Sequence, residues 1–505
     1  MPPARRWSII ALAAVVAVSA YYLMPAKLPG ADGPVAIPEA ARRATCIFLV
    51  AVIFWATEVI PLYATSLCVI GMQVLFIAGR GGMGEKFPAV DGSAVTGLPS
   101  AQVYFNPFAS GIIILFMGGF LLSAAVTKHR LDRKIASRIL RPFAKKPVTL
   151  IFSVMLITAF FSMWMSNTAT AVMMLAIIAP IVRSLPEDDK FHRGVILAVP
   201  FGANIGGIGT PIGTPPNAVA LAALRKQFPE LSLSFLDWMV MAVPLALILI
   251  AAAGVVLLVM FKPAKGTTMP EIEAAPEPIT KKGWATLVVL GAAIALWVCS
   301  GLELELGAFT INLKQYLGLS SAAVALLAAA ALTALGVLDK RDVDSIDWNV
   351  LILMWGGLSL GAAMGETGLI DVIAQLPFAQ FEGFLLAAVV VLLGVTMSTF
   401  MSNTATANVL VPMVIAIGIG GMATAADGTG GGAAIQLAVL TALACSFAMA
   451  MPVSTPPNAI AFATGKIPAA TLVRSGGLLS LICIVTLLLG YQFVMPIFLR
   501  MVLGG

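Results

Sequence analysis

The residues of this chain most suited to bind a ligand form a short polar motif that occurs twice. Ser-Asn-Thr-Ala-Thr occupies residues 166–170 and recurs at 402–406, each time inside a long apolar run. These side chains disfavour helix interiors, because they compete for backbone hydrogen bonds. Without a carboxylate, histidine or metal cluster in the same runs, they supply no general base or activated nucleophile. The motif therefore indicates a binding site. The alternative is a simple turn, which gives no reason for both copies to keep the same residues.

A second repeated motif predicts a break in a helix. Thr-Pro-Pro-Asn-Ala occupies residues 214–218 and recurs at 455–459, and a glycine-rich run precedes the first copy. Two consecutive prolines remove two amide donors and stop a helix. Carbonyl groups freed at the break suit a sodium ion, whereas the N-terminus of the next helix suits an anion. The motif predicts a site for such ligands, with a kink needed only for packing as the alternative.

The chain contains an internal repeat. A double glycine at 118–119 recurs at 356–357, so three sequence elements occur in the same order at nearly equal spacing. Such self-similarity is the signature of duplicated structural units. The polar segment 261–283 is then the predicted cytoplasmic linker between the two halves.

The elements that carry these motifs must lie in a membrane. Of 505 residues, 60% are hydrophobic and 11% are charged, whereas soluble domains carry about 25% charged residues. A membrane helix needs about 20 apolar residues, and residues 147–182, 195–224, 383–426 and 428–465 contain no Asp, Glu, Lys or Arg. Because the alternation typical of a membrane β-barrel is missing, the sequence predicts an all-α polytopic membrane protein.

The distribution of basic residues predicts the orientation. Residues 128–146 contain eight Lys and Arg, whereas the matching stretch 366–382 contains none. Basic loops stay in the cytoplasm, so the matching stretches lie on opposite sides and the halves form an inverted repeat. The rule also explains the net charge of +6 without a nucleic-acid partner. It predicts a cytoplasmic N-terminus and an outside C-terminus, with Arg225 and Lys226 outside as an exception.

The apolar segments predict about 11 transmembrane helices. Residues 1–43 hold the first helix, at 8–24, for which a signal peptide is the alternative. Each repeat then contains ordinary membrane helices, a hairpin with Ser-Asn-Thr at its tip and a broken helix. The first repeat, 44–260, comprises helices 44–62, 64–79, 107–127 and 235–260, the hairpin 148–184 and the broken helix 195–228. The second, 284–498, comprises helices 284–300, 318–337, 347–365 and 474–498, the hairpin 383–421 and the broken helix 434–464.

The doubled motifs resemble those of a known transporter family. Paired Ser-Asn-Thr and Thr-Pro-Pro-Asn motifs are similar to those of the divalent anion/sodium symporter family, the bacterial relatives of sodium–dicarboxylate and sodium–citrate cotransporters. Trp-Ala-Thr-Glu-Val-Ile-Pro at 55–61 also looks like the family signature in its second helix. The resemblance extends from about residue 44 to residue 498. It implies re-entrant hairpins from opposite faces, whose tips meet the broken helices near the bilayer midplane.

The resemblance also implies which residues bind the ligands. Two sodium ions, with a third possible, would be bound at the two tips by Ser162, Ser166, Asn167 and Gly213, and by Ser398, Ser402, Asn403 and Ser454. The substrate would be bound by Asn167, Thr168, Thr214, Pro215, Asn403, Thr404, Thr455 and Pro456. No organic cofactor is implied. Neither tip contains Lys or Arg, so sodium ions would supply the positive charge that a desolvated dianion requires. The coupling between the two ligands must then be reciprocal.

The implied function is sodium-coupled symport of C4-dicarboxylates such as succinate, malate and fumarate. It would use an elevator-type movement within a homodimer in the inner membrane, so the expected partners are a divalent anion, sodium ions, lipid and a second copy. Alternatives on the same fold are a sulfate or citrate transporter and a sodium-independent dicarboxylate exchanger. A passive anion channel is an alternative from another class.

Two further polar residues have two interpretations each. Asn408 follows the second Ser-Asn-Thr motif where the first copy has Val172, and it either contacts substrate or bonds a neighbouring helix. Glu58 is a rare acid near an apolar span, and we expect it to cap a helix or pair at the interface.

Overall fold

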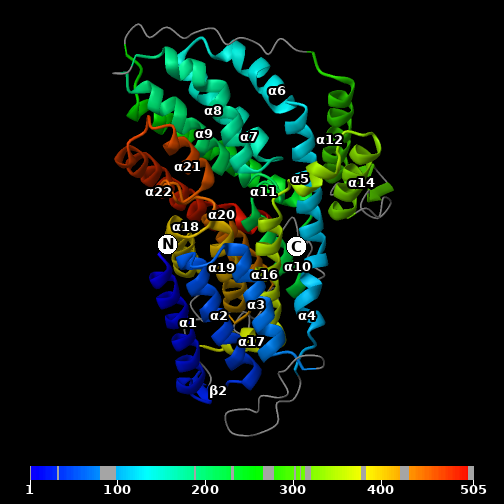
Figure 1. Cartoon of the computed structure of the whole chain (residues 1–505), viewed down its shortest axis with the longest axis vertical. Helices are drawn as coiled ribbons and strands as arrows, with labels where there is room; N and C mark the ends of the chain where they lie inside the picture. Colours follow the sequence, from blue (N-terminus) through cyan, green and yellow to red (C-terminus); the bar gives the residue numbers. More distant parts are fainter. Residues whose placement is uncertain are drawn as a thin grey trace.

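The computed structural model of the protein is nearly all helical (Figure 1). It describes residues 2–30, 33–79, 98–186, 189–228, 233–264, 278–300, 303–306, 309–312, 320–376, 383–420 and 431–498. Strands in these ranges form two short antiparallel pairs, which the sequence analysis did not predict: β1 (Lys27–Pro29) with β2 (Pro34–Ala36), and β3 (Glu303–Leu306) with β4 (Phe309–Asn312). Residues 265–277 of the predicted linker and residue 421 of the second hairpin lie outside the described ranges.

The first half contains the helices up to α11. They are α1 (Pro3–Leu23), α2 (Glu39–Thr57), α3 (Leu62–Phe76), α4 (Gln102–Phe105), the 3-10 helix η2 (Asn106–Ala109), α5 (Gly111–Lys128), α6 (Leu131–Leu140), the 3-10 helix η3 (Arg141–Phe143), α7 (Pro147–Ser162), α8 (Asn167–Ser184), α9 (Phe191–Gly207), α10 (Pro215–Gln227) and α11 (Phe235–Met260).

The second half contains the remaining described helices. They are α12 (Lys281–Cys299), α14 (Ser321–Ala334), α15 (Lys340–Asp344), α16 (Trp348–Glu366), α17 (Leu369–Ala374), α18 (Gly383–Phe400), α19 (Asn403–Gly420), α20 (Gly431–Cys445), α21 (Pro456–Ala463) and α22 (Ala469–Phe493).

By length and composition, nine helical segments in the described ranges could cross a membrane, and five shorter apolar helices accompany them. The predicted all-α polytopic fold is confirmed. Along the long axis, α6 to α9 lie at one end with α21 and α22, and α1 to α3 lie at the other end with α17. The helices α10, α16, α19 and α20 lie between the two groups (Figure 1).

Each Ser-Asn-Thr motif forms the turn of a helical hairpin. In the first hairpin α7 ends at Ser162, and α8 begins at Asn167 with Ser166 as its N-cap. The Ser166 hydroxyl accepts a hydrogen bond from the Ala169 amide at 3.2 Å. The second hairpin, α18 and α19, has the same turn, because Ser402 Oγ accepts from the Ala405 amide at 3.4 Å. The serine thus stabilises the start of the second arm as a helix cap.

Each Thr-Pro-Pro-Asn motif starts a new helix after a break. The prolines occupy the first positions of α10 and α21, where a missing amide hydrogen costs least. Before the break, α9 packs on its own hairpin, α7 and α8, and α20 packs on α18 and α19. After the break, α10 packs on α19 and α20, whereas α21 packs on α8 and α9. The second arm of each broken helix therefore contacts the other half of the chain.

The double glycines permit close helix packing around these elements. A Cβ atom on Gly356 of α16 would lie 2.3 Å from Cβ of Ser66 in α3, and one on Gly118 of α5 would lie 2.6 Å from Cβ of Ala325 in α14. Both distances are shorter than non-bonded carbon atoms allow. The two double glycines therefore allow α16 to approach α3, and α5 to approach α14, without a side chain between their backbones.

Asn408 forms a hydrogen bond to a neighbouring helix, as one of its two interpretations predicts. Its side chain is fully buried, and Nδ2 donates to the Leu353 carbonyl oxygen of α16 at 3.0 Å. A Cβ atom on Gly357 would lie 1.9 Å from Asn408 Oδ1, so the second glycine of the pair makes room for this amide. Glu58 is exposed and ends α2 in the left-handed conformation, with φ 47°.

The predicted start of the second helix at residue 44 is wrong, because α2 begins at Glu39. Its charged first turn was predicted to lie outside the helix. The structure satisfies these charges by tertiary contacts: Glu39 accepts from Arg43 Nε at 3.0 Å and from the Tyr21 hydroxyl at 2.6 Å. Arg42 donates to the Tyr21 carbonyl oxygen at 3.2 Å. Charges that are paired and hydrogen-bonded can enter a buried helix turn.

Candidate functional site

Three oxygen atoms meet behind the tip of the first hairpin. The buried Ser162 Oγ lies 2.6 Å from Asn167 Oδ1 and 2.8 Å from the carbonyl oxygen of Ala203 in α9. A hydroxyl group has one hydrogen and can donate to only one of these two acceptors. One oxygen–oxygen contact is therefore left without a proton between its atoms. Oxygen atoms gathered in this way suit a hard cation, which takes oxygen ligands.

The second hairpin repeats the arrangement. Ser398 is also buried, and its Oγ lies 2.7 Å from Asn403 Oδ1 and 2.6 Å from the carbonyl oxygen of Cys445, the last residue of α20. The carbonyl partner is 41 residues from the serine in the first half and 47 in the second. The same three-oxygen group therefore forms in both halves from a hairpin and the end of the helix before the break.

A hydroxyl group in each break holds the hairpin tip of the same half. The Thr210 hydroxyl donates to the carbonyl oxygen of Met163, and the Ser454 hydroxyl donates to that of Thr399 at 3.0 Å. Met163 and Thr399 directly follow the two buried serines. Ser454 was predicted as a site residue, whereas Thr210 was not. In the first half the predicted residue Gly213 contributes its amide, which donates to Thr210 Oγ1 at 3.1 Å.

The asparagine of each Thr-Pro-Pro-Asn motif satisfies the carbonyl groups of its break. Asn217 Nδ2 lies 2.8–3.3 Å from three carbonyl oxygens, those of Gly207, Ile208 and Thr210. Asn458 Nδ2 donates at 3.0 Å and 3.1 Å to the carbonyl oxygens of Met449 and Met451. Buried carbonyl groups in a membrane protein require such partners. These asparagines are not among the predicted site residues, although their place after both double prolines was a usable signal.

Asn204 joins the two halves at the centre of the site. This buried residue of α9 donates from Nδ2 to Thr455 Oγ1 at 3.1 Å, and Nδ2 lies 3.4 Å from Asn458 Oδ1. Among the described residues, Asn204 Oδ1 has no hydrogen-bond partner. Asn204 is not among the predicted site residues. The available signal was a single polar side chain within the apolar run that leads to the first break.

The structure brings some predicted residues together and separates others. Each tip asparagine contacts its buried serine, and Thr455 contacts Asn204 and also accepts from the Asn458 amide at 3.3 Å. Thr168 is exposed, whereas Thr404 is buried. No hydrogen bond between described residues links one tip directly to the other. Within the site, the halves are linked instead by the hydrogen bond from Asn204 to Thr455.

The remaining predicted residues lie at the starts of the helices after the breaks. Thr214 is buried and makes no side-chain cap, Pro215 is partly buried, and Pro456 is exposed. Both tips and both breaks lack Asp, Glu, Lys, Arg and His. Four helices, α8, α10, α19 and α21, begin at these motifs. The helix dipole places partial positive charge at these starts without any charged side chain. Free amide hydrogens come mainly from α8 and α19, because the first two residues of α10 and α21 are prolines.

Paired hairpins and broken helices around a neutral, oxygen-rich centre define a membrane transporter of the class with internal repeats. The chain belongs to the family described as the sodium:sulfate symporter transmembrane region, whose model matches residues 5–500.

Known proteins similar to this chain are transporters. An uncharacterized transporter of Haemophilus influenzae is 33% identical over 409 residues, which are 79% of this chain and 84% of the relative. A sodium-dependent dicarboxylate transporter, SdcS, of Staphylococcus saprophyticus is 28% identical over 468 residues, with 88% and 84% covered. Among solved structures, the YdaH transporter of Alcanivorax borkumensis matches with a TM-score of 0.53 at 13% identity, covering 91% of this chain and 99% of that protein. This last likeness concerns the fold alone.

Proposed function

We propose that the protein carries C4-dicarboxylates into the cell together with sodium ions. The observation that carries the proposal is the pair of three-oxygen groups, Ser162 with Asn167 and Ser398 with Asn403, each closed by a backbone carbonyl. Two sodium ions at these positions would separate the crowded oxygen atoms and provide two positive charges in a site without charged side chains. A dianion beside them would then be neutralised, so sodium and substrate would bind cooperatively.

The choice of a dicarboxylate is supported by the name of the staphylococcal relative, a sodium-dependent dicarboxylate transporter. Sulfate is the second candidate, because the family description names it. The geometry supports either dianion, since helix N-termini bind carboxylate and sulfate groups alike. A succinate molecule is longer than a sulfate ion and can place one carboxylate near each tip, at Asn167 with Thr168 and at Asn403 with Thr404.

We also propose an elevator-type movement. The hairpins and broken helices of both halves form one packed unit, because α10 and α21 cross to the opposite half. This unit would move against helices such as α5 and α16, with α5 packed on α14 and α16 on α3. The same proposal includes a homodimer in the inner membrane, a cytoplasmic N-terminus and the predicted repeat boundaries.

The direct test is uptake of labelled succinate by proteoliposomes that contain the purified protein. We expect saturable uptake with external sodium and none with potassium, inhibited by malate and fumarate. Citrate, sulfate and phosphate serve as competitors. Transport of sulfate but not of succinate would show that the substrate is sulfate. Succinate flux that needs internal dicarboxylate and ignores sodium would indicate an exchanger, and flux that neither saturates nor needs sodium would indicate a channel.

Alanine at the two tip threonines should weaken substrate binding. Thr404→Ala and Thr168→Ala each remove a hydroxyl donor, and we expect KM for succinate to rise about tenfold or more, since one hydrogen bond to a charged group contributes about 1.5 kcal/mol or more. Thr404→Ser and Thr168→Ser keep the hydroxyl and should retain KM near the wild-type value. Initial uptake rates at saturating sodium measure the effect. Unaltered KM in both alanine variants would place the substrate elsewhere.

A further inference from the structure

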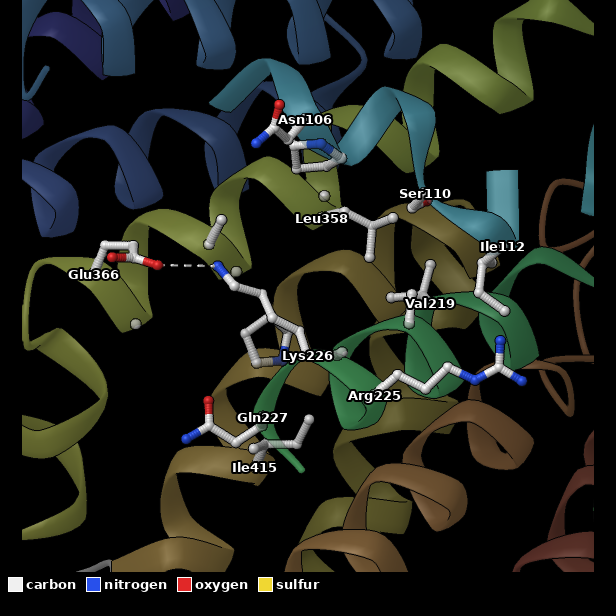
Figure 2. A pocket seen from close by; sticks show the side chains of 18 of the residues that line it. Asn106, Ser110, Ile112, Val219, Arg225, Lys226, Gln227, Leu358, Glu366 and Ile415 are labelled. Atoms are coloured by element: carbon white, nitrogen blue, oxygen red, sulfur yellow. Dashed lines mark ion pairs between the residues drawn. The ribbon is translucent and has the colours of Figure 1, made fainter. Parts of the chain in front are cut away.

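A cavity of about 760 Å³ lies beside α10, apart from the residues predicted to bind sodium and substrate (Figure 2). Residues of α10 and α19 line one side, and residues of η2, α5, α16 and α17 line the other. On α10 the lining runs from Val219 to Gln227. Val219 is four residues beyond Pro215, so the inner end of the cavity lies about 6 Å along the helix from the break. The lining residue of α10 nearest the proposed substrate site is therefore about one helix turn from Pro215.

The predicted orientation puts the cavity on the outer side of the membrane. Gly111, the first residue of α5, lines it, whereas the other end of α5 is Lys128, where the basic stretch begins. Basic stretches stay in the cytoplasm. Arg225 and Lys226, which the sequence analysis noted as an exception to this rule, both line the cavity. The positive-inside rule therefore does not explain why these two cations lie on the outer side.

The positive charge of Arg225 is not cancelled within the described residues. Its guanidinium donates to the Leu233 carbonyl oxygen at 3.2 Å, and its buried Nε has no hydrogen-bond partner. Lys226 differs, because its Nζ lies 3.7 Å from Glu366 Oε1 on α16. The arginine side chain extends away from this ion pair (Figure 2). A partly buried cation without a counter-ion favours the approach of an anion.

The acidic groups of the cavity are more exposed than Arg225. Glu366 is 44% exposed and Lys226 48% in their side chains, so solvent screens their pair and it contributes little to stability. Asp371, the other carboxylate in the lining, is exposed on α17. The least hydrated charge of the cavity is therefore positive.

We propose that this cavity is an outer capture site for the transported dianion, with Arg225 as the residue that attracts it. The inference rests on the proposed function, because it requires an anionic substrate. The planar guanidinium matches a carboxylate or sulfate group. Lys226 provides a second positive charge whenever its weak pair with Glu366 opens. The four charged lining residues, two basic and two acidic, cancel formally, so the attraction comes from the less hydrated Arg225. This cation lies about 15 Å along α10 from Pro215, and it raises the local concentration of the anion and its rate of arrival.

The test uses the full-length protein in right-side-out and inside-out membrane vesicles. The probe is labelled succinate, or labelled sulfate if the wild-type protein transports sulfate instead. For Arg225→Gln we expect KM at low ionic strength to rise about fivefold to tenfold for substrate on the outer side only, with maximal velocity retained. Arg225→Lys should restore most of the affinity. Choline chloride at constant sodium should remove the difference, because salt screens steering.

Two further variants separate electrostatics from packing. Glu366→Gln removes a negative charge and releases Lys226, so KM on the outer side should fall about twofold to fivefold, opposite in sign to Arg225→Gln. Lys27→Gln is the matched control. Lys27 is an exposed residue of β1, placed on the outer side by the predicted topology and absent from the cavity lining. Its loss should leave KM unchanged.

The outcomes distinguish this inference from the proposed function. Normal sodium-driven uptake with the same outer KM in wild type and Arg225→Gln would overturn the capture site alone. A rise in KM that persists at high salt, occurs equally on both sides or also follows Glu366→Gln would assign Arg225 to packing and overturn it as well. Absence of dianion transport by the wild-type protein would overturn both.

Discussion

Replacing Ser162 and Ser398 with alanine should each raise the sodium concentration for half-maximal uptake about tenfold. Each serine holds two oxygen atoms, an asparagine Oδ1 and a backbone carbonyl, at 2.6–2.8 Å. Loss of one oxygen ligand that is worth about 1.4 kcal/mol corresponds to a factor of ten in affinity. In the double variant each site is weakened about tenfold, and both must be filled for transport, so it should require roughly twice the sodium of either single variant if the sites act independently. Sodium titration of succinate uptake measures the change.

A serine on the same helix provides the control. Ser153 of α7 is also buried, but its hydroxyl donates only within its own helix, to the Leu150 carbonyl at 3.0 Å. Ser153→Ala should therefore leave the sodium dependence unaltered. Equal sodium dependence in wild type and in both single variants would mean that the ions bind elsewhere. A change shared by Ser153→Ala would instead indicate a general effect on packing.

Aspartate at Asn217 or Asn458 should destabilise the protein by roughly 3 kcal/mol or more. The substitution keeps the shape of the side chain but removes the amide hydrogens that serve the carbonyl oxygens of the break. It also places a buried negative charge or an extra acceptor against those oxygens. Thermal unfolding of the purified protein in detergent measures the loss. We expect uptake to be lost in the same variants.

An exposed asparagine is the matched control for this substitution. Asn349 lies exposed in the first turn of α16, where a negative charge is favourable near the helix N-terminus. Asn349→Asp should keep the wild-type melting temperature. If Asn217→Asp and Asn458→Asp also keep the wild-type melting temperature, the carbonyl oxygens of the breaks do not depend on the side-chain amides of these asparagines.

The fold was predictable from the sequence because its signals are local. Apolar runs of sufficient length predict membrane helices, and the serine before each tip asparagine becomes the cap of the next arm. The double prolines occupy the first turns of α10 and α21, as their missing amide hydrogens require. The start of α2 was mispredicted, since the partner that allows its charged turn to be buried, Tyr21, lies in another helix.

Contacts between distant segments left no such signal. The carbonyl oxygens opposite Ser162 and Ser398 belong to residues whose side chains, Ala203 and Cys445, indicate nothing about ligand binding. Asn204 meets Thr455 across 251 residues. Arg225 was read only as an exception to the charge rule, and its cavity forms only where α10 meets α16.

The sequence by itself determined that this is a helical membrane protein with two related halves, and where each half turns and breaks. Those properties follow from hydrophobicity, proline and capping, which act within one or two helix turns. Only the tertiary structure decided which backbone carbonyls face the buried serines, which asparagines satisfy the breaks and which of the two cavity cations has a carboxylate partner. These contacts depend on how the helices pack against one another. The sequence gives no signal for the carbonyl groups, because every residue type has the same backbone carbonyl oxygen.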